Sequence, residues 1–328
     1  MARRTWCASV PGLLLAFAAC SEASAAWVGD RYFPSTLATT VPTPADFFNP
    51  PNLVVLPKTA TSTREIDIPT TYSKLITPEW AVIVAETFRI IEQPNTPTRS
   101  GFDNLVLSTQ YALYTNAQHQ FIVTIGGSAA IGGTGSRNIA SSFSTFTPTV
   151  YLGKGFGDLP DSMAWLRPVN VTANFGVAPP THSTTRSTVT LPTSTIAFTT
   201  LSAVPTGATA LTGGVNPNIF LWSFALEYTQ LTTNSYTGTD GKPRRFPRGW
   251  VPLVEFAFQT PLNGPLDGRT TGTVNPGVIW VDRYLQFALE AIIPINTASG
   301  RDIGVRAQAH LYLSELLPDT LGKPLFGN

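Results

Sequence analysis

The sequence is short of charge, of cysteine and of long apolar runs. Charged residues make up 12% of the 328 residues, which is about half of the share usual in soluble domains. Lys and Arg number 21 against 20 Asp and Glu, so no basic surplus can neutralise phosphates, and we expect no nucleic-acid partner. Beyond residue 25 no apolar run reaches the length of a membrane-spanning helix, about 18 residues or more, which excludes such a helix there.

Both cysteines, Cys7 and Cys20, lie in an N-terminal segment built like a secretory signal peptide. Two arginines precede an apolar stretch, and a small-x-small site follows at 23–25, so we expect a signal peptide at 1–25. Its removal would leave no thiol, which excludes a disulfide scaffold, a Cys-ligated metal and a Cys nucleophile. A less favoured interpretation keeps Cys20 as a lipidated N-terminus.

Threonine, glycine and proline are abundant where charge is scarce, with 45 Thr, 26 Gly and 28 Pro. Such a composition, with short apolar runs, favours strands over helices. In residues 167–177 apolar side chains occupy every second position and alternate with Asn, Thr and Gly. Residues 102–114 and 303–313 repeat this pattern, which places apolar side chains on one face of a strand and polar side chains on the other.

The composition of the polar face separates two all-β folds. The solvent face of a soluble β-sandwich is normally rich in Lys, Glu and Asp. Here the polar face carries Thr, Ser, Asn, Gln and Gly, and Lys occurs at only five positions in the chain. Small polar side chains of this kind are typical of a barrel lumen. We therefore predict an all-β fold, an antiparallel transmembrane β-barrel of about 10 to 12 strands, with a soluble β-sandwich as the alternative.

Strand counting is constrained because a single-chain bacterial barrel has an even number of strands. Ten strands are predicted, at 79–92, 102–115, 119–132, 143–155, 166–178, 187–201, 217–230, 249–260, 275–293 and 303–314. The segment 187–201 is the weakest because it is Thr-rich and contains Pro192. Two further strands, around Leu53–Leu56 and Glu65–Ile68, would raise the number to twelve. The expected units are a signal peptide at 1–25, a Pro-rich arm or plug at 26–78, the barrel at 79–314 and a C-terminal tail at 315–328.

Ionisable side chains at membrane depth are expected to face the lumen, where they pair and tune which solutes pass. The candidate lumen-lining residues are Glu86, Arg89, Glu227, Glu255, Asp282, Glu290, Arg306 and His310. Aromatic residues near predicted strand ends suit girdles at headgroup level, and they are Phe102, Tyr111, Tyr151, Trp222, Tyr228, Trp250 and Trp280. Arg283 shares the parity of apolar neighbours, so we expect it beyond the apolar band or at a bulge.

Motifs for catalysis, metals or cofactors are scarce. His119, His182 and His310 have no partner at metal-ligand spacing. The glycine clusters at 126–135 and 153–158 lack the Lys followed by Ser or Thr of a phosphate loop and the helix that a dinucleotide site needs, so we expect turns there. We predict no metal site, no cofactor and no enzymatic activity. A membrane-embedded hydrolase that uses His310 with a lumen or rim serine stays open as an alternative.

Two runs of residues carry a family resemblance. The closing segment from His310 to Phe326, with Tyr151-Leu152-Gly153-Lys154-Gly155-Phe156 upstream, resembles bacterial outer-membrane β-barrel proteins of the phenol-degradation-pathway (MetA-pathway-like) transporter group. The resemblance implies a barrel of about a dozen strands that passes small apolar or aromatic compounds. The chain departs from many such barrels because it continues past Leu313 instead of ending the last strand on a terminal aromatic residue.

These observations predict a porin-like channel in the outer membrane of a Gram-negative bacterium, exported by its signal peptide, for passive uptake of small and, by resemblance, hydrophobic or aromatic solutes. The expected partners are the lipid bilayer, small-molecule solutes and the barrel-assembly machinery. A structural or adhesive surface protein, with the Thr-rich stretch 179–216 as its contact surface, is a further alternative.

Overall fold

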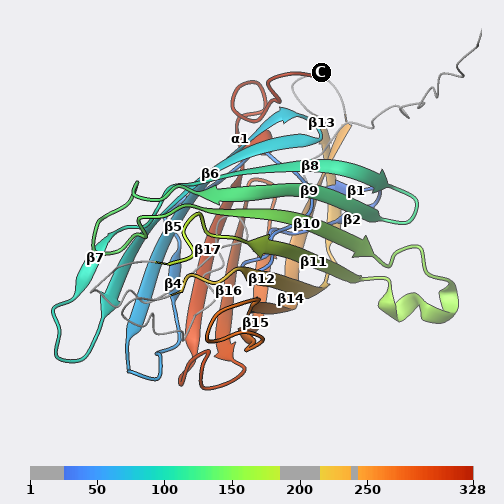
Figure 1. Ribbon diagram of the computed structural model, residues 1–328. Helices are drawn as coiled ribbons and strands as arrows, with labels where there is room; N and C mark the ends of the chain where they lie inside the picture. The colour runs from blue at the N-terminus through green and yellow to red at the C-terminus, as the bar shows by residue number, and fades with distance from the viewer. Residues whose placement is uncertain (1–25, 185–214, 238–242, 328) are drawn as a thin grey trace, which may run out of the picture.

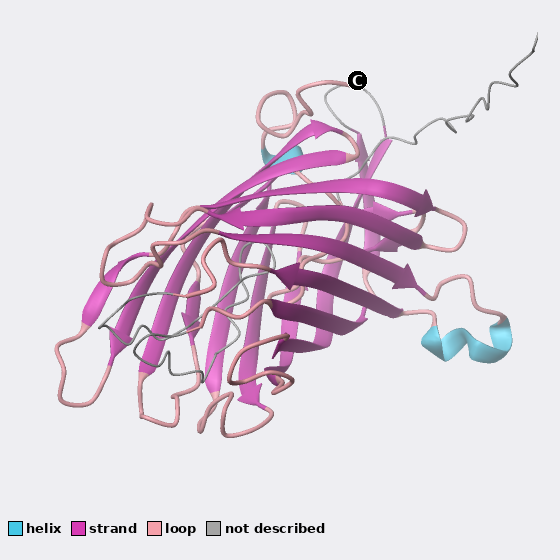
Figure 2. Ribbon diagram, in the orientation of Figure 1, coloured by secondary structure: helices cyan, strands magenta, loops and turns pink. Residues whose placement is uncertain are grey.

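The computed structural model describes residues 26–184, 215–237 and 243–327 (Figure 1). Within these ranges strands form nearly all of the regular secondary structure. Helix is confined there to two short pieces, the 3-10 helix η1 (Asp161–Leu166) and α1 (Leu313–Leu316) (Figure 2). Neither of them, nor any other helical stretch in the described ranges, is long and apolar enough to cross a membrane.

The strands succeed one another along the chain with mostly short connections. They are β1 (Trp27–Val28), β2 (Arg31–Tyr32), β3 (Phe47–Asn49), β4 (Leu53–Val55), β5 (Arg64–Thr77), β6 (Trp80–Glu92), β7 (Arg99–Phe102), β8 (Val106–Asn116), β9 (Phe121–Ala130), β10 (Thr145–Gly155), β11 (Val169–Ala178), β12 (Ile219–Tyr228), β13 (Thr232–Thr237), β14 (Pro243–Pro261), β15 (Thr271–Val281), β16 (Leu285–Pro294) and β17 (Gly304–Tyr312). All of their pairings are antiparallel.

The sheet closes on itself because β3 and β4 pair with β17 on one side and with β5 on the other. β3 and β4 together fill one strand position, β7 leads into β8, and β13 prolongs the hairpin of β12 and β14. The described part of the chain therefore forms a closed barrel of twelve strands. Closure leaves no open sheet edge. A sheet that spans a membrane must be closed in this way, because the bilayer core offers no hydrogen bonds to an open edge.

The start of β3 and the end of β17 lie at the same end of the barrel, which we call the terminal end. The tight β5–β6 and β15–β16 turns lie there too, and the described C-terminal residues follow α1 at that end (Figure 1). Longer connections, such as 131–144 and 262–270, lie at the opposite, loop end. The terminal end also carries one long connection, 156–168 between β10 and β11, which contains η1.

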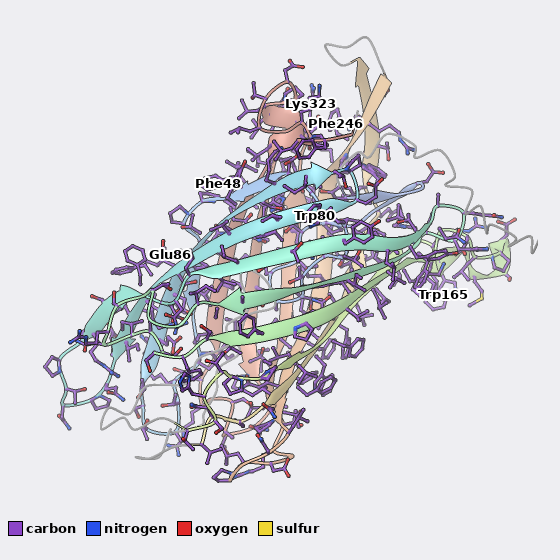
Figure 3. All side chains as sticks on the ribbon, turned by 45° about the horizontal axis from the view of Figure 1, so that its top comes forward. Phe48, Trp80, Glu86, Trp165, Phe246 and Lys323 are labelled. Carbon is purple, nitrogen blue, oxygen red and sulfur yellow. The ribbon has the colours of Figure 1, made fainter. Side chains whose placement is uncertain are left out.

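The two faces of the wall differ as the alternation predicts. Along β11 the residues Asn170, Thr172 and Asn174 are fully buried, whereas Phe175 and Val177 are exposed. Large apolar side chains are exposed around the outside of the wall (Figure 3), and they include Val84, Leu107, Tyr111, Ile125, Val150, Leu226, Trp250, Phe287, Leu289 and Val305. An outward apolar band around a polar interior identifies a transmembrane β-barrel.

The wall differs from the predicted strand list in two places. It begins at Phe47 rather than at residue 79, because β3–β4 and β5 occupy the span assigned to an arm or plug. The predicted strand 275–293 is two strands, because Asp282, Arg283 and Tyr284 form a turn. The predicted strand 187–201 lies outside the described residues.

Candidate functional site

The lumen contains the segment 26–46, which we call the plug. After the β1–β2 hairpin it runs through the interior to the start of β3. Phe33, Leu37 and Asp46 are among its fully or almost fully buried side chains. Buried residues of the plug pack on the inner face of the wall, because Tyr32 and Leu37 belong to one apolar cluster with residues of β14, β15 and β16.

A carboxylate of the wall holds the middle of the plug. Glu255, on β14, is fully buried and accepts hydrogen bonds from three successive backbone N–H groups. The donors are Leu37 at 3.0 Å, Ala38 at 2.6 Å and Thr39 at 2.9 Å. Successive N–H groups that converge on one anion form a strong, charge-assisted contact. Beside it, Ala38 packs against Ala257 of the same strand.

Further hydrogen bonds fix the plug to other strands. Gln286, on β16, accepts a hydrogen bond from the backbone N–H of Ser35 and donates one to the Ser35 carbonyl. The hydroxyl groups of Tyr32 and Tyr312 are hydrogen-bonded to each other. Across the lumen, Gln110 and Thr124, on β8 and β9, donate to the carbonyls of Val41 and Pro42. The plug is thus held by side chains from opposite sides of the wall and crosses the lumen between them.

The last plug residue, Asp46, is tied to the terminal part of β5. Its Oδ1 accepts hydrogen bonds from Lys74 Nζ at 2.7 Å and from the backbone N–H of Leu75 at 2.8 Å. Burial raises the pKa of Asp46, and the contacts with Lys74 and Leu75 oppose that shift.

At the outer rim of the same end, the hydrogen bond from Lys154 is the main cause that lowers the pKa of Asp158, which also contacts His119.

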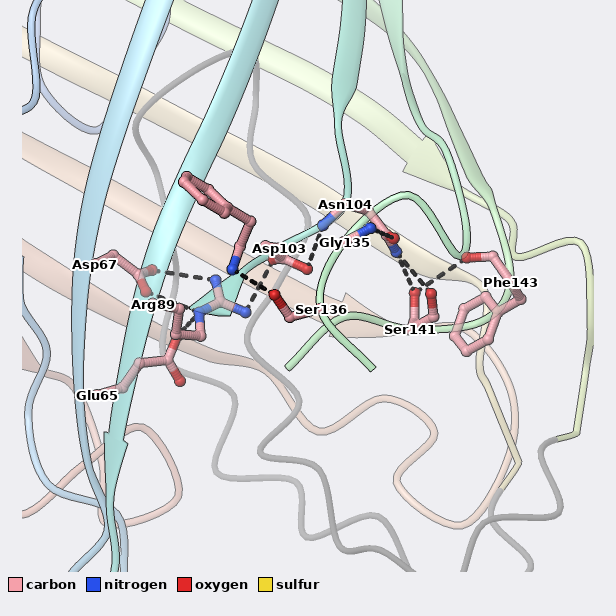
Figure 4. Close-up of polar contacts among 10 residues, drawn as sticks. Glu65, Asp67, Arg89, Asp103, Asn104, Gly135, Ser136, Ser141 and Phe143 are labelled. Atoms are coloured by element: carbon pink, nitrogen blue, oxygen red, sulfur yellow. Dashed lines mark hydrogen bonds and ion pairs between the residues drawn. The ribbon is translucent and has the colours of Figure 1, made fainter. Parts of the chain in front are cut away.

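Towards the loop end, Arg89 is the centre of a charged cluster (Figure 4). Its guanidinium lies 2.8 Å from Glu65, 2.7 Å from Asp67 and 2.9 Å from Asp103. The inner faces of β5 and β6 carry the members of this cluster that lie on strands, Glu65, Asp67 and Arg89, and all three are buried. The loop 131–144 reaches this cluster, because Ser136 Oγ accepts from the N–H of Phe102.

Other predicted lumen residues are also buried on the inner face. Arg306 and Glu290 form an ion pair between β17 and β16. Glu227, on β12, lies opposite Asn170 of β11, with an amide-to-carboxylate distance of 3.5 Å. His310 contacts the amide oxygen of Asn49 at 2.8 Å and packs against the rings of Phe47 and Tyr312. The partner of its Nδ1 atom is therefore an amide and not a serine hydroxyl.

Three sequence expectations need correction. Glu86 is exposed on the outer face, because it lies three residues from the inward-facing Arg89 and an odd separation puts two residues on opposite faces of a strand. Asp282 lies in the β15–β16 turn, 3.7 Å from Arg248, rather than at membrane depth. Tyr151 is buried on the inner face and is no girdle residue. Arg283 lies in the same turn and pairs with Glu315, beyond the apolar band.

The sequence prediction missed several residues of the interior, namely Glu65, Asp67, Asp103, Gln286 and the plug residues that contact them. Glu65 and Asp67 are two residues apart, a spacing that places both carboxylates on one strand face. The many prolines of 26–78 favoured an arm over a strand there, so this spacing was not used. The structure accommodates one of these prolines within the strand, because Pro69 follows Asp67 on the same inner face of β5.

Many polar atoms on the inner face have no hydrogen-bond partner in the described protein. They include both amide atoms of Asn174, Asn275 and Gln308, the hydroxyl of Ser223 and Oδ1 of Asn170. These residues are buried, and their polar atoms can form hydrogen bonds with water or with a polar solute in the lumen.

No group of three or more His, Cys, Asp or Glu side chains that could hold a metal ion occurs in the described ranges. The site is a closed transmembrane β-barrel whose polar lumen is occupied by an internal N-terminal plug.

No protein-family model matches the chain, and no curated protein matches it. Among solved structures 31 chains match. One of them is a crystal structure of the porin NanC in a rhombohedral crystal form, with 9% sequence identity, a TM-score of 0.45, and coverage of 80% of this chain and 98% of that chain. At this level of similarity the fold assignment depends on the strand pairing of the chain itself.

Proposed function

We propose that the protein is a porin-like channel of the outer membrane that conducts small solutes when the plug leaves the lumen. The observation that carries this proposal is the interior itself. Its wall presents polar side chains on every side, and the plug is held there by hydrogen bonds and packing rather than as a strand of the sheet. Separate, non-covalent contacts of this kind can break while the wall stays closed.

Polar groups of the wall are available to line an open lumen. The amide atoms of Asn174, Asn275 and Gln308 make no hydrogen bond to the plug or to the wall, and they can bind water or a polar solute in the lumen.

The resemblance to the phenol-degradation-pathway group adds a finer proposal, that the solutes are small apolar or aromatic compounds. One feature of the lumen supports it. The inner face of β14 and β15 carries Val251, Leu253, Ile279 and Val281, which pack against Tyr32 and Leu37 of the plug. Displacement of the plug would leave this apolar strip open to a solute of similar chemistry.

Uptake into proteoliposomes tests both levels of the proposal. Vesicles with folded protein should admit small solutes faster than protein-free vesicles, and small aromatic solutes should enter faster than sugars of similar mass. Uptake without an aromatic preference would contradict only the solute class. Sealed vesicles that contain folded protein would contradict the channel.

A catalytic role for His310 is tested in parallel. Substitution His310→Ala should leave uptake unchanged, because its ring nitrogen contacts the amide oxygen of Asn49. A hydrolytic activity of the purified protein that this substitution abolishes would favour the hydrolase instead.

A further inference from the structure

Acidic side chains outnumber basic ones on the inner face of the wall. Among the described residues of the wall strands, the buried acids are Glu65, Asp67, Glu227, Glu255 and Glu290, and the buried arginines are Arg89 and Arg306. Arg89 pairs with Glu65 and Asp67, and Arg306 pairs with Glu290. Glu227 and Glu255 have no such ion pair with an arginine or lysine of the described wall.

The plug supplies the positive partners of these two carboxylates. Glu255 accepts the three plug N–H groups of Leu37, Ala38 and Thr39. Glu227 interacts electrostatically with the guanidinium of Arg31, which is itself anchored to Gln120 and Thr229. When the plug leaves, both partners leave with it, and both carboxylates face the open lumen.

Unpartnered amide oxygens lie next to both carboxylates. Asn170 is opposite Glu227 in the β11–β12 register, and Asn275 is opposite Glu255 in the β14–β15 register. Both asparagines are fully buried, and the Oδ1 atom of each has no hydrogen-bond partner in the described protein. Carboxylates with neighbouring free amide oxygens form a set of acceptors, which suits a ligand that carries positive charge and several N–H donors.

We propose that Glu227 and Glu255, with Asn170 and Asn275, form a lumen site for cationic solutes of the ammonium or guanidinium class, and that the open channel prefers cations to anions. The plug occupies this site in the closed state with chemistry of the same kind, a guanidinium and a row of N–H donors. The inference rests on the proposed channel function and concerns charge, so it is independent of the aromatic preference.

The test uses planar bilayers with a potassium chloride gradient across the full-length protein. The variant Gln286→Ala serves as the background, because it removes the hydrogen bonds of Gln286 to Ser35 of the plug and to Tyr312, the wall residue that holds Tyr32, without changing any charge. We expect its reversal potential to give a K⁺ over Cl⁻ permeability ratio of about 10, the scale on which charged clefts concentrate counter-ions. Glu227→Gln and Glu255→Gln in that background should each lower the ratio, and both together should bring it near one.

Matched variants separate site chemistry from general effects of charge and folding. Glu86→Gln removes a carboxylate of β6 that is exposed on the outer face, so it should leave the ratio unchanged. Glu227→Asp keeps the charge and should keep the preference. Methylguanidinium added to one side should reduce the K⁺ current of Gln286→Ala, and it should not do so in the variant that also carries Glu227→Gln and Glu255→Gln.

The outcomes distinguish the site from the channel. A current that favours chloride, a current without preference, or a preference that survives the loss of both glutamates overturns the cation site while the channel stands. Absence of current from every variant, with each folded by gel mobility, overturns the channel and the site with it.

Discussion

At the residue scale, buried charge is the feature that most constrains this barrel. Arg89 forms ion pairs with two buried carboxylates of β5 and with a third, Asp103, beside them. Removal of one partner from such a cluster leaves unpaired charge in a low-dielectric interior, which costs far more than the pair itself contributes. The residues of this cluster therefore have larger effects on stability than exposed ion pairs of the same geometry.

Substitution Arg89→Met should destabilise the barrel by about 3–5 kcal/mol, because it strands Glu65 and Asp67 without their counter-charge. The urea concentration that converts half of the protein to the unfolded gel band measures this loss. Arg167→Met is the matched control, since Arg167 and its partner Asp161 are exposed and such pairs contribute about 0–1 kcal/mol. Equal shifts for the two variants would contradict the assigned burial of the cluster.

Substitution Glu255→Gln should weaken the hold on the plug. Hydrogen bonds to a charged acceptor contribute about 1.5–3 kcal/mol each, against about 0.5–1.5 kcal/mol for neutral ones. A loss of about 1.4 kcal/mol already changes the ratio of open to closed states tenfold, so we expect a higher open probability in single-channel records. Glu86→Gln should have the same open probability as the unmodified protein. An unchanged open probability in Glu255→Gln would contradict the role of Glu255 in holding the plug.

Alternation along one strand was enough to predict inward polar side chains in β11. Asn170, Thr172 and Asn174 follow directly from alternation in 167–177. The prediction that Glu86 faces the lumen was wrong because it considered only the depth of the residue in the membrane. It left out the odd separation from Arg89 along the strand, which places the two side chains on opposite faces. The partners of Arg89 and Glu255 could not be predicted, since they depend on strand register and on the path of the plug, which are set by contacts between distant segments.

At the element scale, the closing seam is the irregular part of the wall. Ladder pairs between the first strand and β17 stop at Phe48 and Leu311 and resume at Leu53 and Ala307, because Pro50 and Pro51 cannot donate to a ladder. The side chain of Asn52 substitutes for the missing backbone bonds. Its amide accepts from the N–H of Ala309 at 2.8 Å and donates to the Ala309 carbonyl at 3.3 Å.

Substitution Asn52→Ala should therefore lower the stability of the seam by about 1–3 kcal/mol, through the two hydrogen bonds that it removes. The temperature at which the folded gel band disappears reports the effect. Leu53→Ala is the control, because Leu53 is exposed on the outer face and makes no side-chain hydrogen bond. A seam that is insensitive to Asn52→Ala but sensitive to Leu53→Ala would contradict this role of the amide.

The same prolines explain why the first two strands were only an alternative in the sequence prediction. Proline favours edges and bulges, so a Pro-rich span indicates an arm more readily than a central strand. In a closed barrel the bulge is tolerated because Asn52 restores pairing with β17. The strand predicted at 275–293 had a different problem. The inward-facing positions are odd-numbered before the turn, at Ile279 and Val281, and even-numbered after it, at Gln286 and Ala288, and this change of parity had been interpreted as a possible bulge rather than as a turn.

At the scale of the whole molecule, twelve strands close a wall whose outside is apolar and whose inside is polar. Such a barrel should resist SDS in the cold and run as a compact species that shifts to lower mobility after boiling. Cold and boiled samples of the membrane-extracted protein on one gel show the difference. Identical mobility, with the protein in the soluble periplasmic fraction, would favour the β-sandwich alternative.

The central claim, a barrel that conducts when its plug leaves the lumen, is tested most directly by locking the plug. Ala38 of the plug packs against Ala257 of β14, so the variant Ala38→Cys/Ala257→Cys places two Cβ atoms near the spacing of about 3.5–4.5 Å that a disulfide needs. Leu289→Cys/Ala307→Cys, a register pair of β16 and β17, is the control that links two wall strands without touching the plug.

Planar-bilayer current before and after reduction is the decisive measurement. We predict that the oxidised Ala38→Cys/Ala257→Cys variant is silent, that reductant restores its current, and that the wall-linked control conducts in both states. Equal current from the oxidised and reduced plug variant, with the disulfide verified, would contradict the account.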